Sequence, residues 1–182
     1  MKQRLLFLGP PGAGKGTQAD ILCAKCGLLH LSTGDLLRAE VKAASPLGLE
    51  ASEVMNRGEL VSDSLVLSIV EKRLSGYKGG WLLDGFPRTL DQAESLESLL
   101  EQIKQPVEAV LLIELNEELL IERLLARGRT DDNDAVIRHR IQLYKEKTFP
   151  LIDHYNKQGL VKPIEGDGDI EDIASQIEDC LK

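Results

Sequence analysis

The sequence predicts an α/β fold with a parallel sheet of five strands covered by helices on both faces, and three observations support this prediction. Short, continuous apolar runs alternate with stretches of helical length, as in sheets whose strands are buried on both faces. The first apolar run leads into a glycine-rich loop, after which a helical pattern begins. With 182 residues, the chain is long enough for one domain that has a sizeable core and a small insertion.

Five apolar runs are the expected strands, and they lie at residues 4–8, 28–31, 81–83, 109–114 and 160–164. Pro163 lies inside the last run, and proline has no N–H group to donate to a neighbouring strand. We therefore expect the last strand at an edge of the sheet.

Helical patterns occupy the segments between and after these runs, at residues 14–26, 35–44, 47–56, 63–74, 90–102, 117–127, 134–158 and 170–181. The longest of them contains Pro150, where we expect a bend. Three helices fall between the second and third strands, which is more than one crossover between parallel strands requires. We therefore expect an inserted subdomain at about residues 32–75.

The loop after the first strand reads Gly9-Pro10-Pro11-Gly12-Ala13-Gly14-Lys15-Gly16-Thr17. Its glycines allow backbone conformations and close approaches that a Cβ atom would prevent. At the start of a helix, such a loop turns successive N–H groups inward and forms a nest for phosphate oxygens, and Lys15 adds a positive charge for the outer phosphates. The strand–loop–helix context disfavours the alternative, a turn that binds nothing. These features predict a P-loop three-layer fold.

The charge of the chain is negative overall but positive in one segment. The net charge of −8 and the isoelectric point of about 5.0 give no indication of a nucleic-acid-binding surface. No apolar run approaches the length of a membrane span, and the chain enters its first strand without a signal peptide. We therefore expect a soluble cytoplasmic enzyme without a membrane partner. Half of the ten arginines lie close together in sequence, at Arg123, Arg127, Arg129, Arg138 and Arg140.

The chain has three cysteines, an odd number that does not suggest a disulfide framework. Cys23 and Cys26 have the spacing of a redox motif, but with Ala19 and Leu22 they form the buried stripe of an amphipathic helix. Core packing is therefore favoured over redox or metal chemistry. A second cysteine pair that would complete a zinc site is missing from the sequence, so we expect no structural zinc.

A carboxylate, Asp84, follows the apolar part of the third strand and precedes Gly85, Phe86, Pro87 and Arg88. The carboxyl ends of parallel strands form the edge where open α/β sheets bind ligands. Alone, Asp84 would more often form a turn or cap a helix, but beside a phosphate loop we favour Mg²⁺ held through water molecules. The guanidinium of Arg88 is close enough in sequence to meet a phosphate at the same edge.

Several other motifs accompany the glycine-rich loop and the end of the third strand. Ser32 or Thr33 could by itself simply cap the following helix. The additional motifs are Leu31-Ser32-Thr33-Gly34-Asp35-Leu36-Leu37-Arg38, Arg57 with Gly58-Glu59-Leu60-Val61, and Asp131-Asp132-Asn133. From about Leu5 to Gly168, and in the right order, this set resembles the adenylate kinases of the nucleoside monophosphate kinase family. The segment from Arg127 to Asp131 is too short for the hairpin of the long-lid relatives, so the resemblance is to the short-lid type.

The resemblance implies reversible phosphoryl transfer from ATP to AMP, giving two ADP, in a monomer that uses Mg²⁺ with ATP. It implies that the moving phosphoryl charge is neutralised by Lys15, Arg88, Arg129 and Arg140. The residues implied to bind ATP are Gly12, Ala13, Gly14, Lys15, Gly16, Thr17, Arg123, Arg127 and Gly168. Those implied to bind AMP are Thr33, Arg38, Glu59, Leu60, Val61, Gly85, Phe86, Pro87, Arg88, Gln92, Arg129 and Arg140. We also expect strand order 2-3-1-4-5, an AMP-binding subdomain at about 32–75 and a minimal lid at about 126–132.

The helix after Asp132 gives a check that is independent of the resemblance. Ile137, Ile141, Tyr144 and Thr148 form one stripe of that helix, and Arg140 projects beside the stripe. An arginine that flanks a packed face is unusual unless it meets an anion. Arg138 points more outward, and we expect it to be solvated or peripheral.

Two other kinds of nucleotide-binding protein remain as alternatives to an adenylate kinase. A pyrimidine nucleoside monophosphate kinase would have the same fold, but such relatives typically carry Ala and Asn where this chain has Thr33 and Gln92. A P-loop ATPase or nucleotide switch is the second alternative. The guanine-reading Asn-Lys-x-Asp motif of such switches is absent, because the segment at residues 156–159 lacks the acid.

Overall fold

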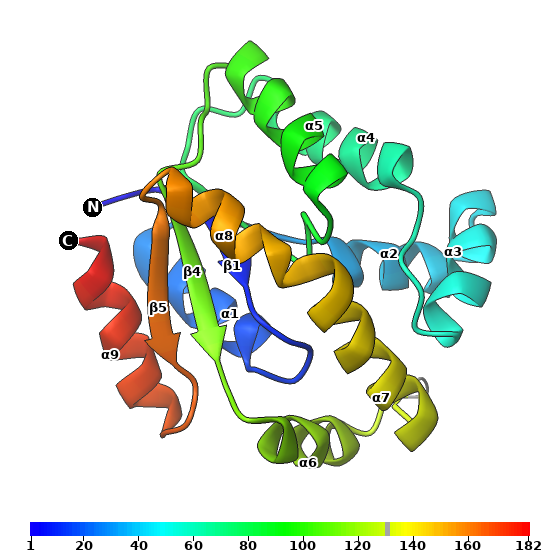
Figure 1. Ribbon diagram of the computed structural model, residues 1–182. Coiled ribbons are helices and arrows are strands. Elements are labelled where there is room, and N and C mark those ends of the chain that lie inside the picture. Colours follow the sequence, from blue (N-terminus) through cyan, green and yellow to red (C-terminus); the bar gives the residue numbers. More distant parts are fainter. Residues whose placement is uncertain (130–131) are drawn as a thin grey trace.

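A five-stranded parallel sheet forms the centre of the computed structural model, which describes residues 1–129 and 132–182 (Figure 1). The order of the strands is β2-β3-β1-β4-β5, and every neighbouring pair is parallel, which confirms the prediction. The strands are β1 (Arg4–Leu8), β2 (Leu29–Ser32), β3 (Trp81–Asp84), β4 (Ala109–Glu114) and β5 (Val161–Glu165).

The central position of β1 explains its continuous apolar sequence. Leu5 and Phe7 belong to one core cluster, and Leu6 and Leu8 belong to another on the opposite face. The last strand, β5, pairs with β4 at the edge of the sheet, as Pro163 predicted. Because β1 has a partner on both sides, the loop that follows it emerges at the middle of the sheet edge.

Helices cover both faces of the sheet. The first core cluster contains side chains of α1 (Lys15–Cys26), α6 (Glu117–Arg127), α7 (Asp134–Leu143) and α9 (Ile170–Leu181). The second contains side chains of α4 (Asp63–Leu74), α5 (Leu90–Gln102) and α8 (Pro150–Lys157). The chain therefore has the three layers that the sequence predicted. No helix in the part of the chain that the structure describes has the length and apolar character needed to cross a lipid bilayer.

The insertion between β2 and β3 consists of α2 (Thr33–Lys42), α3 (Pro46–Asn56) and α4. In Figure 1, α2 and α3 project to the right of the sheet. The backbones of α2 and α3 approach each other so closely at Gly48 that a Cβ atom there would collide with the backbone of Glu40. That the region of about residues 32–75 acts as a separate AMP-binding unit stays a prediction.

The helix expected at residues 134–158 is interrupted, which corrects the prediction of one helix with a bend. The α-helix α7 ends at Leu143, a π-helical turn spans Tyr144–Thr148, and α8 begins at Pro150. Pro150 has no N–H group for the regular pattern, and the backbone N–H of Phe149 instead donates over 2.8 Å to the carbonyl of Tyr144, five residues back. The wider turn changes the phase of the chain between the two helices.

The cysteines confirm the core-packing interpretation. Cys23 is buried in the first core cluster, and Cys26 packs against the same cluster. Both are free, as is Cys180. Burial, with Asp20 and Cys26 nearby, raises the pKa of Cys23 to about 12, so its thiol stays protonated and unreactive at neutral pH.

Candidate active site

A cavity of about 560 Å³ lies where β1, β2 and β3 end, and its wall includes residues from both the phosphate loop and the insertion. Most of the sequence-predicted site residues line it. Three do not: Ala13 is buried, Pro87 lines a smaller neighbouring cavity of about 90 Å³, and Gly168 is exposed. The structure thus brings together all predicted site residues except Ala13, Pro87 and Gly168.

The phosphate loop connects β1 to α1. Gly12 has φ of +87°, and a Cβ atom there would lie 2.8 Å from Cγ of Leu124, so the loop can pack against α6 only with glycine at this position. Gly14 is the N-cap residue directly before α1, and no side chain among the described residues caps this end. The first N–H groups of α1 therefore face the cavity without a side-chain acceptor, an arrangement that suits an anion.

Lys15 reaches back over the loop, and its Nζ donates hydrogen bonds to the carbonyls of Gly9 (2.8 Å) and Pro10 (2.9 Å). The pKa of Lys15 is lowered to about 8. Burial is the largest cause; Asp84 opposes it, and the positive charges of Arg88 and Arg127 act in the same direction as burial. The loop thus carries an ammonium group whose charge is only partly balanced by the protein.

Asp84 ends β3 and lies beside Phe7 of β1 and Ser32 of β2 in the sheet register. Only 9% of the residue is exposed, and it lines the cavity. Thr33 is also buried and donates its hydroxyl to the backbone carbonyl of Asp84 over 3.3 Å. Within the described residues, no three His, Cys, Asp or Glu side chains are grouped so that they could hold a metal ion by themselves. One carboxylate with water and nucleotide phosphates is nevertheless a common arrangement for Mg²⁺.

Arg88 lies on the loop after β3, and its Nε donates over 2.7 Å to the carbonyl of Gly85. Burial lowers the pKa of Arg88; Asp84 raises it again, and Arg140 and Arg38 lower it. The cations around the cavity therefore repel one another, and a bound polyphosphate would relieve this repulsion.

Arg129 has a similar environment. Burial lowers its pKa, the neighbouring charges of Arg127 and Arg38 lower it further, and Asp35 and Asp132 oppose them. The expected lid extends from about 126 to 132, and Thr130 and Asp131 of that segment lie outside the described residues. Arg127, Arg129 and Asp132 are described, and the two arginines line the cavity.

Asp132 organises this arginine group. Its side chain is 0% exposed and accepts two hydrogen bonds from Arg127, at 2.8 and 2.6 Å. It also accepts from the backbone N–H of Arg129 and from the guanidinium of Arg140, both at 3.2 Å. Burial alone would raise the pKa of Asp132, but these partners, Arg127 first, lower it below its ordinary value.

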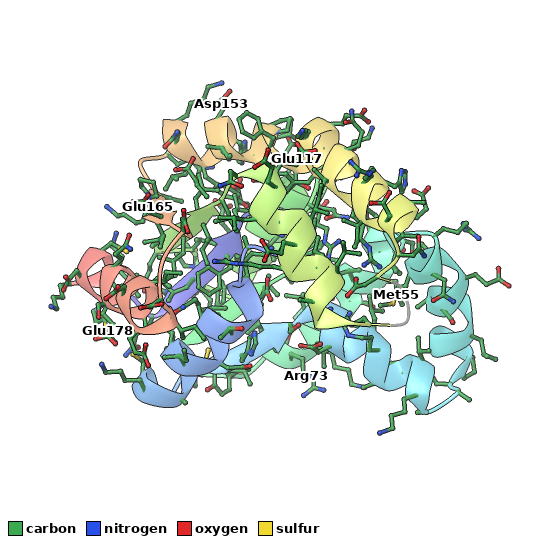
Figure 2. All side chains as sticks on the ribbon, turned by 90° about the horizontal axis from the view of Figure 1, so that it is seen from below. Met55, Arg73, Glu117, Asp153, Glu165 and Glu178 are labelled. Atoms are coloured by element: carbon green, nitrogen blue, oxygen red, sulfur yellow. The ribbon has the colours of Figure 1, made fainter. Side chains whose placement is uncertain are left out.

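Arg140 and Arg138 are placed as the helical phase predicted. The side chain of Arg140 is 17% exposed, lines the cavity and donates over 3.2 Å to the carbonyl of Met55. Met55, which is labelled in Figure 2, lies near the end of α3. The side chain of Arg138 is 62% exposed and pairs with Asp134 on its own helix over 3.0 Å. Arg140 therefore connects α7 to the insertion, whereas Arg138 lies outside the cavity.

Gln92, near the start of α5, is 3% exposed and lines the same cavity. Its Oε1 accepts from the backbone N–H of Arg88 (2.7 Å), and its Nε2 donates to Asp63 of α4 (2.6 Å). Arg38, on α2, pairs with Asp35 over 2.5 Å. Arg123, on α6, donates to the carbonyl of Gly166 over 3.2 Å.

Sequence reasoning assigned no individual role to Asp63, Asp132 or Thr148. Asp132 was part of a motif, but its contacts are with arginines before it in the chain and with one on α7, and the sequence alone does not show that these residues meet. Thr148 lies in the π-helical turn and Asp63 in the first turn of α4. An acid at the start of a helix has an ordinary explanation in the helix dipole, so the sequence held no signal for its contact with Gln92.

A phosphate loop, a carboxylate at the end of the neighbouring strand and arginines around one cavity define a phosphotransferase of the P-loop class. Residues 7–160 match the family model described as "Adenylate kinase". The chain is 68% identical over 181 residues to an adenylate kinase of Prochlorococcus marinus (strain MIT 9303), with 100% of each chain covered. It is 64% identical over 182 residues to an adenylate kinase of Synechococcus sp. (strain CC9311), again with 100% of each covered. The chain therefore belongs to the adenylate kinase family.

Proposed function

We propose that this chain transfers the γ-phosphoryl group of ATP to AMP inside the 560 Å³ cavity, with the phosphate loop on the donor side and the insertion on the acceptor side. The activity itself, ATP + AMP ⇌ 2 ADP, is that of the adenylate kinase family. The observation that carries the proposed residue roles is the convergence of Lys15, Arg88, Arg129 and Arg140 on one cavity.

On the donor side, the backbone from Gly12 to Thr17 surrounds the ATP phosphates, and Lys15 exchanges its carbonyl partners for phosphate oxygens. Arg123 and Arg127 also line the cavity and add positive charge. Gly168 is exposed and outside the cavity wall, so contact between it and the ATP base requires that the base extends beyond the cavity.

On the acceptor side, AMP lies between the insertion and the loop after β3. Arg38 and Arg88 meet its phosphate, Thr33 and Gln92 meet the base, and the residues at 59–61 and 85–87 form the surrounding wall. All of these except Pro87 line the cavity, which supports an acceptor nucleotide bound next to the phosphate loop.

The reaction needs no side-chain base. A phosphate oxygen of AMP attacks the γ-phosphorus of ATP, and the bond from that phosphorus to the bridging oxygen of the leaving ADP breaks as the new one forms. The attacking oxygen is already anionic, so the protein has to align the two nucleotides and neutralise the charge on the moving group. Lys15, Arg88, Arg129 and Arg140 supply that charge from separate elements.

Adenylate kinases generally use ATP with Mg²⁺, and the residues of this cavity fit that ion. Asp84 would hold Mg²⁺ through water molecules, and the ion would neutralise phosphate charge. A metal ion with only one protein carboxylate nearby is typical of Mg²⁺, which keeps several of its waters. We propose in addition that the enzyme has no structural zinc and acts as a cytoplasmic monomer, which metal analysis, cell fractionation and sedimentation of the purified chain would test.

A screen of acceptors tests the proposal. The purified chain is supplied with MgATP and with AMP, CMP, UMP or GMP, and ADP formation is measured for each. We expect rapid turnover with AMP, much slower turnover with the other acceptors, and little ATP hydrolysis when no acceptor is added. Equal turnover of UMP would favour the pyrimidine kinase alternative, and hydrolysis that does not depend on AMP would favour an ATPase.

A further inference from the structure

The side-chain amide of Gln92 is held at both of its ends. The backbone N–H of Arg88 donates to Oε1 over 2.7 Å, and Nε2 donates to Oδ1 of Asp63 over 2.6 Å. Gln92 is 3% exposed, so little water reaches its amide, whereas the residue Asp63 is exposed to solvent. Gln92 lines the cavity, whereas Asp63 is not among the lining residues and belongs to the first turn of α4.

The two partners allow only one orientation of this amide. A backbone N–H can only donate, so it requires the oxygen of the amide, and an ionised carboxylate can only accept, so it requires the nitrogen. Rotating the amide by 180° would place NH₂ against the N–H of Arg88 and oxygen against the carboxylate of Asp63. Each end would lose a hydrogen bond and gain a repulsion.

We propose that Asp63 is a specificity-determining residue, which acts through Gln92 and makes the acceptor site select adenine over 6-oxopurines. This inference rests on the proposed function, in which Gln92 faces the base of the acceptor nucleotide. Asp63 does not touch the nucleotide; its role is to fix which end of the Gln92 amide donates and which accepts.

The hydrogen-bonding capacity that remains on Gln92 matches adenine. After its two protein contacts, the amide keeps one N–H on the nitrogen and one acceptor position on the oxygen. Adenine presents an acceptor at N1 and a donor at its 6-amino group, so both can be paired at once. A 6-oxopurine presents a donor at N1–H and an acceptor at O6, and it would require the amide orientation that Asp63 and Arg88 prevent.

The test compares AMP with IMP, which differ in this part of the base, as acceptors with MgATP. In the unmodified enzyme we expect AMP to have the higher kcat/KM. Asp63→Asn keeps the size of the side chain, but its amide can either accept from Gln92 or donate to it. We expect this variant to reduce the AMP-to-IMP ratio of kcat/KM at least about tenfold, because the site rejects IMP mainly by leaving polar groups unpaired. The KM for ATP should stay unchanged.

Two further variants separate selectivity from folding. Asp63→Ala removes the acceptor without adding a donor, so kcat/KM should fall for AMP without a corresponding rise for IMP. Asp91→Asn also neutralises a carboxylate in the first turn of a helix, α5, and should change the ratio less than about twofold. Thermal unfolding of all variants reports any loss of structure.

An AMP-to-IMP ratio in Asp63→Asn within about twofold of the unmodified enzyme would refute the role of Asp63. The same conclusion would follow if Asp91→Asn lowered the ratio equally. Either result would leave the proposed function intact as long as the unmodified enzyme makes ADP from ATP and AMP. Failure to make ADP from these two substrates would instead contradict the proposed function itself.

Discussion

The hydroxyl of Thr148 donates a hydrogen bond to the backbone carbonyl of Arg88 over 2.8 Å, although the two residues are 60 positions apart in sequence. Thr148 is the last residue of the π-helical turn between α7 and α8, and it is 8% exposed. The irregular turn thus contributes to holding the loop that carries Arg88. A π-helical turn inside a longer helical segment is uncommon and often lies near a functional site.

Replacing Thr148 by Val keeps the shape of the side chain but removes its donor. We expect a loss of about 1 kcal/mol in the free energy of unfolding and a fall in kcat, because the carbonyl of Arg88 loses its partner and the loop gains freedom. Urea unfolding and steady-state kinetics measure the two effects. Ser98→Ala is a suitable control, because Ser98 also donates to a carbonyl, on the exposed face of α5. If both variants had the same kcat, the turn would have no part in positioning Arg88.

The strands and the layers of this fold were predictable because their signals are local. An apolar run such as the one at residues 4–8 indicates a strand that is buried on both faces of the sheet, and Pro163 indicates a strand at the edge of the sheet. The interruption at residues 144–148 was not predictable in the same way. Proline indicates a disturbance of the helix, but the form of that disturbance depends on the packing of Thr148 and its neighbours against the rest of the chain.

The candidate site likewise has some residues that local sequence signals reveal and others that only the folded chain reveals. The phosphate loop, Asp84 and Arg88 were found from sequence because each lies next to the end of a strand. The partners that orient the site, such as Asp63 and Asp132, come from other elements and carry no local signature of that role. Their functions depend on distances that only the folded chain sets.

The lowered pKa of Lys15 predicts that the enzyme takes up protons when it binds ATP. Its pKa of about 8 means that the side chain is mostly neutral at pH 8.5 in the free enzyme. The negative phosphates of ATP favour the charged form and raise this pKa, so binding at pH 8.5 should take up part of a proton. Calorimetry at pH 8.5 in two buffers of different ionisation enthalpy measures the uptake. Lys15→Arg keeps a positive charge that does not titrate in this range, so its binding enthalpy should not depend on the buffer; equal buffer dependence in both proteins would rule out Lys15 as the source.

Gly85 allows a comparison of two glycines with similar backbones. Gly85 and Gly159 have φ of +86° and +71°, so alanine at either position should cost about 1 kcal/mol of stability. Only at Gly85 would the new Cβ meet another group, Oγ1 of Thr33 at 2.7 Å, whereas nothing lies within 4 Å at Gly159. Gly85→Ala should therefore destabilise the chain more and raise the KM for AMP. The same KM in both variants would show that Thr33 has no contact with AMP that depends on this geometry.

The proposed contacts of Thr33 and Gln92 with the acceptor base predict that these two residues select adenine. Thr33→Ala combined with Gln92→Asn introduces the residues typical of pyrimidine kinases. The shorter Asn cannot span the contacts that Gln92 makes with Arg88 and Asp63. We expect the preference for AMP over CMP and UMP to relax more than the affinity for ATP falls, as competition assays and direct ATP binding would measure. An unchanged AMP preference in the double variant would place base selection elsewhere.

The central claim is that arginines from separate elements converge on the transferred phosphoryl group. The most direct test compares kcat in Arg129→Ala, Arg140→Ala and Arg138→Ala. Arg129 and Arg140 line the cavity, whereas Arg138 pairs with Asp134 at the surface. We expect the first two to lower kcat at least about a hundredfold, on the order of 3 kcal/mol, because these contacts strengthen as charge develops on the phosphoryl group. Arg138→Ala should lower it less than about tenfold. A silent Arg140→Ala together with a costly Arg138→Ala would contradict the account.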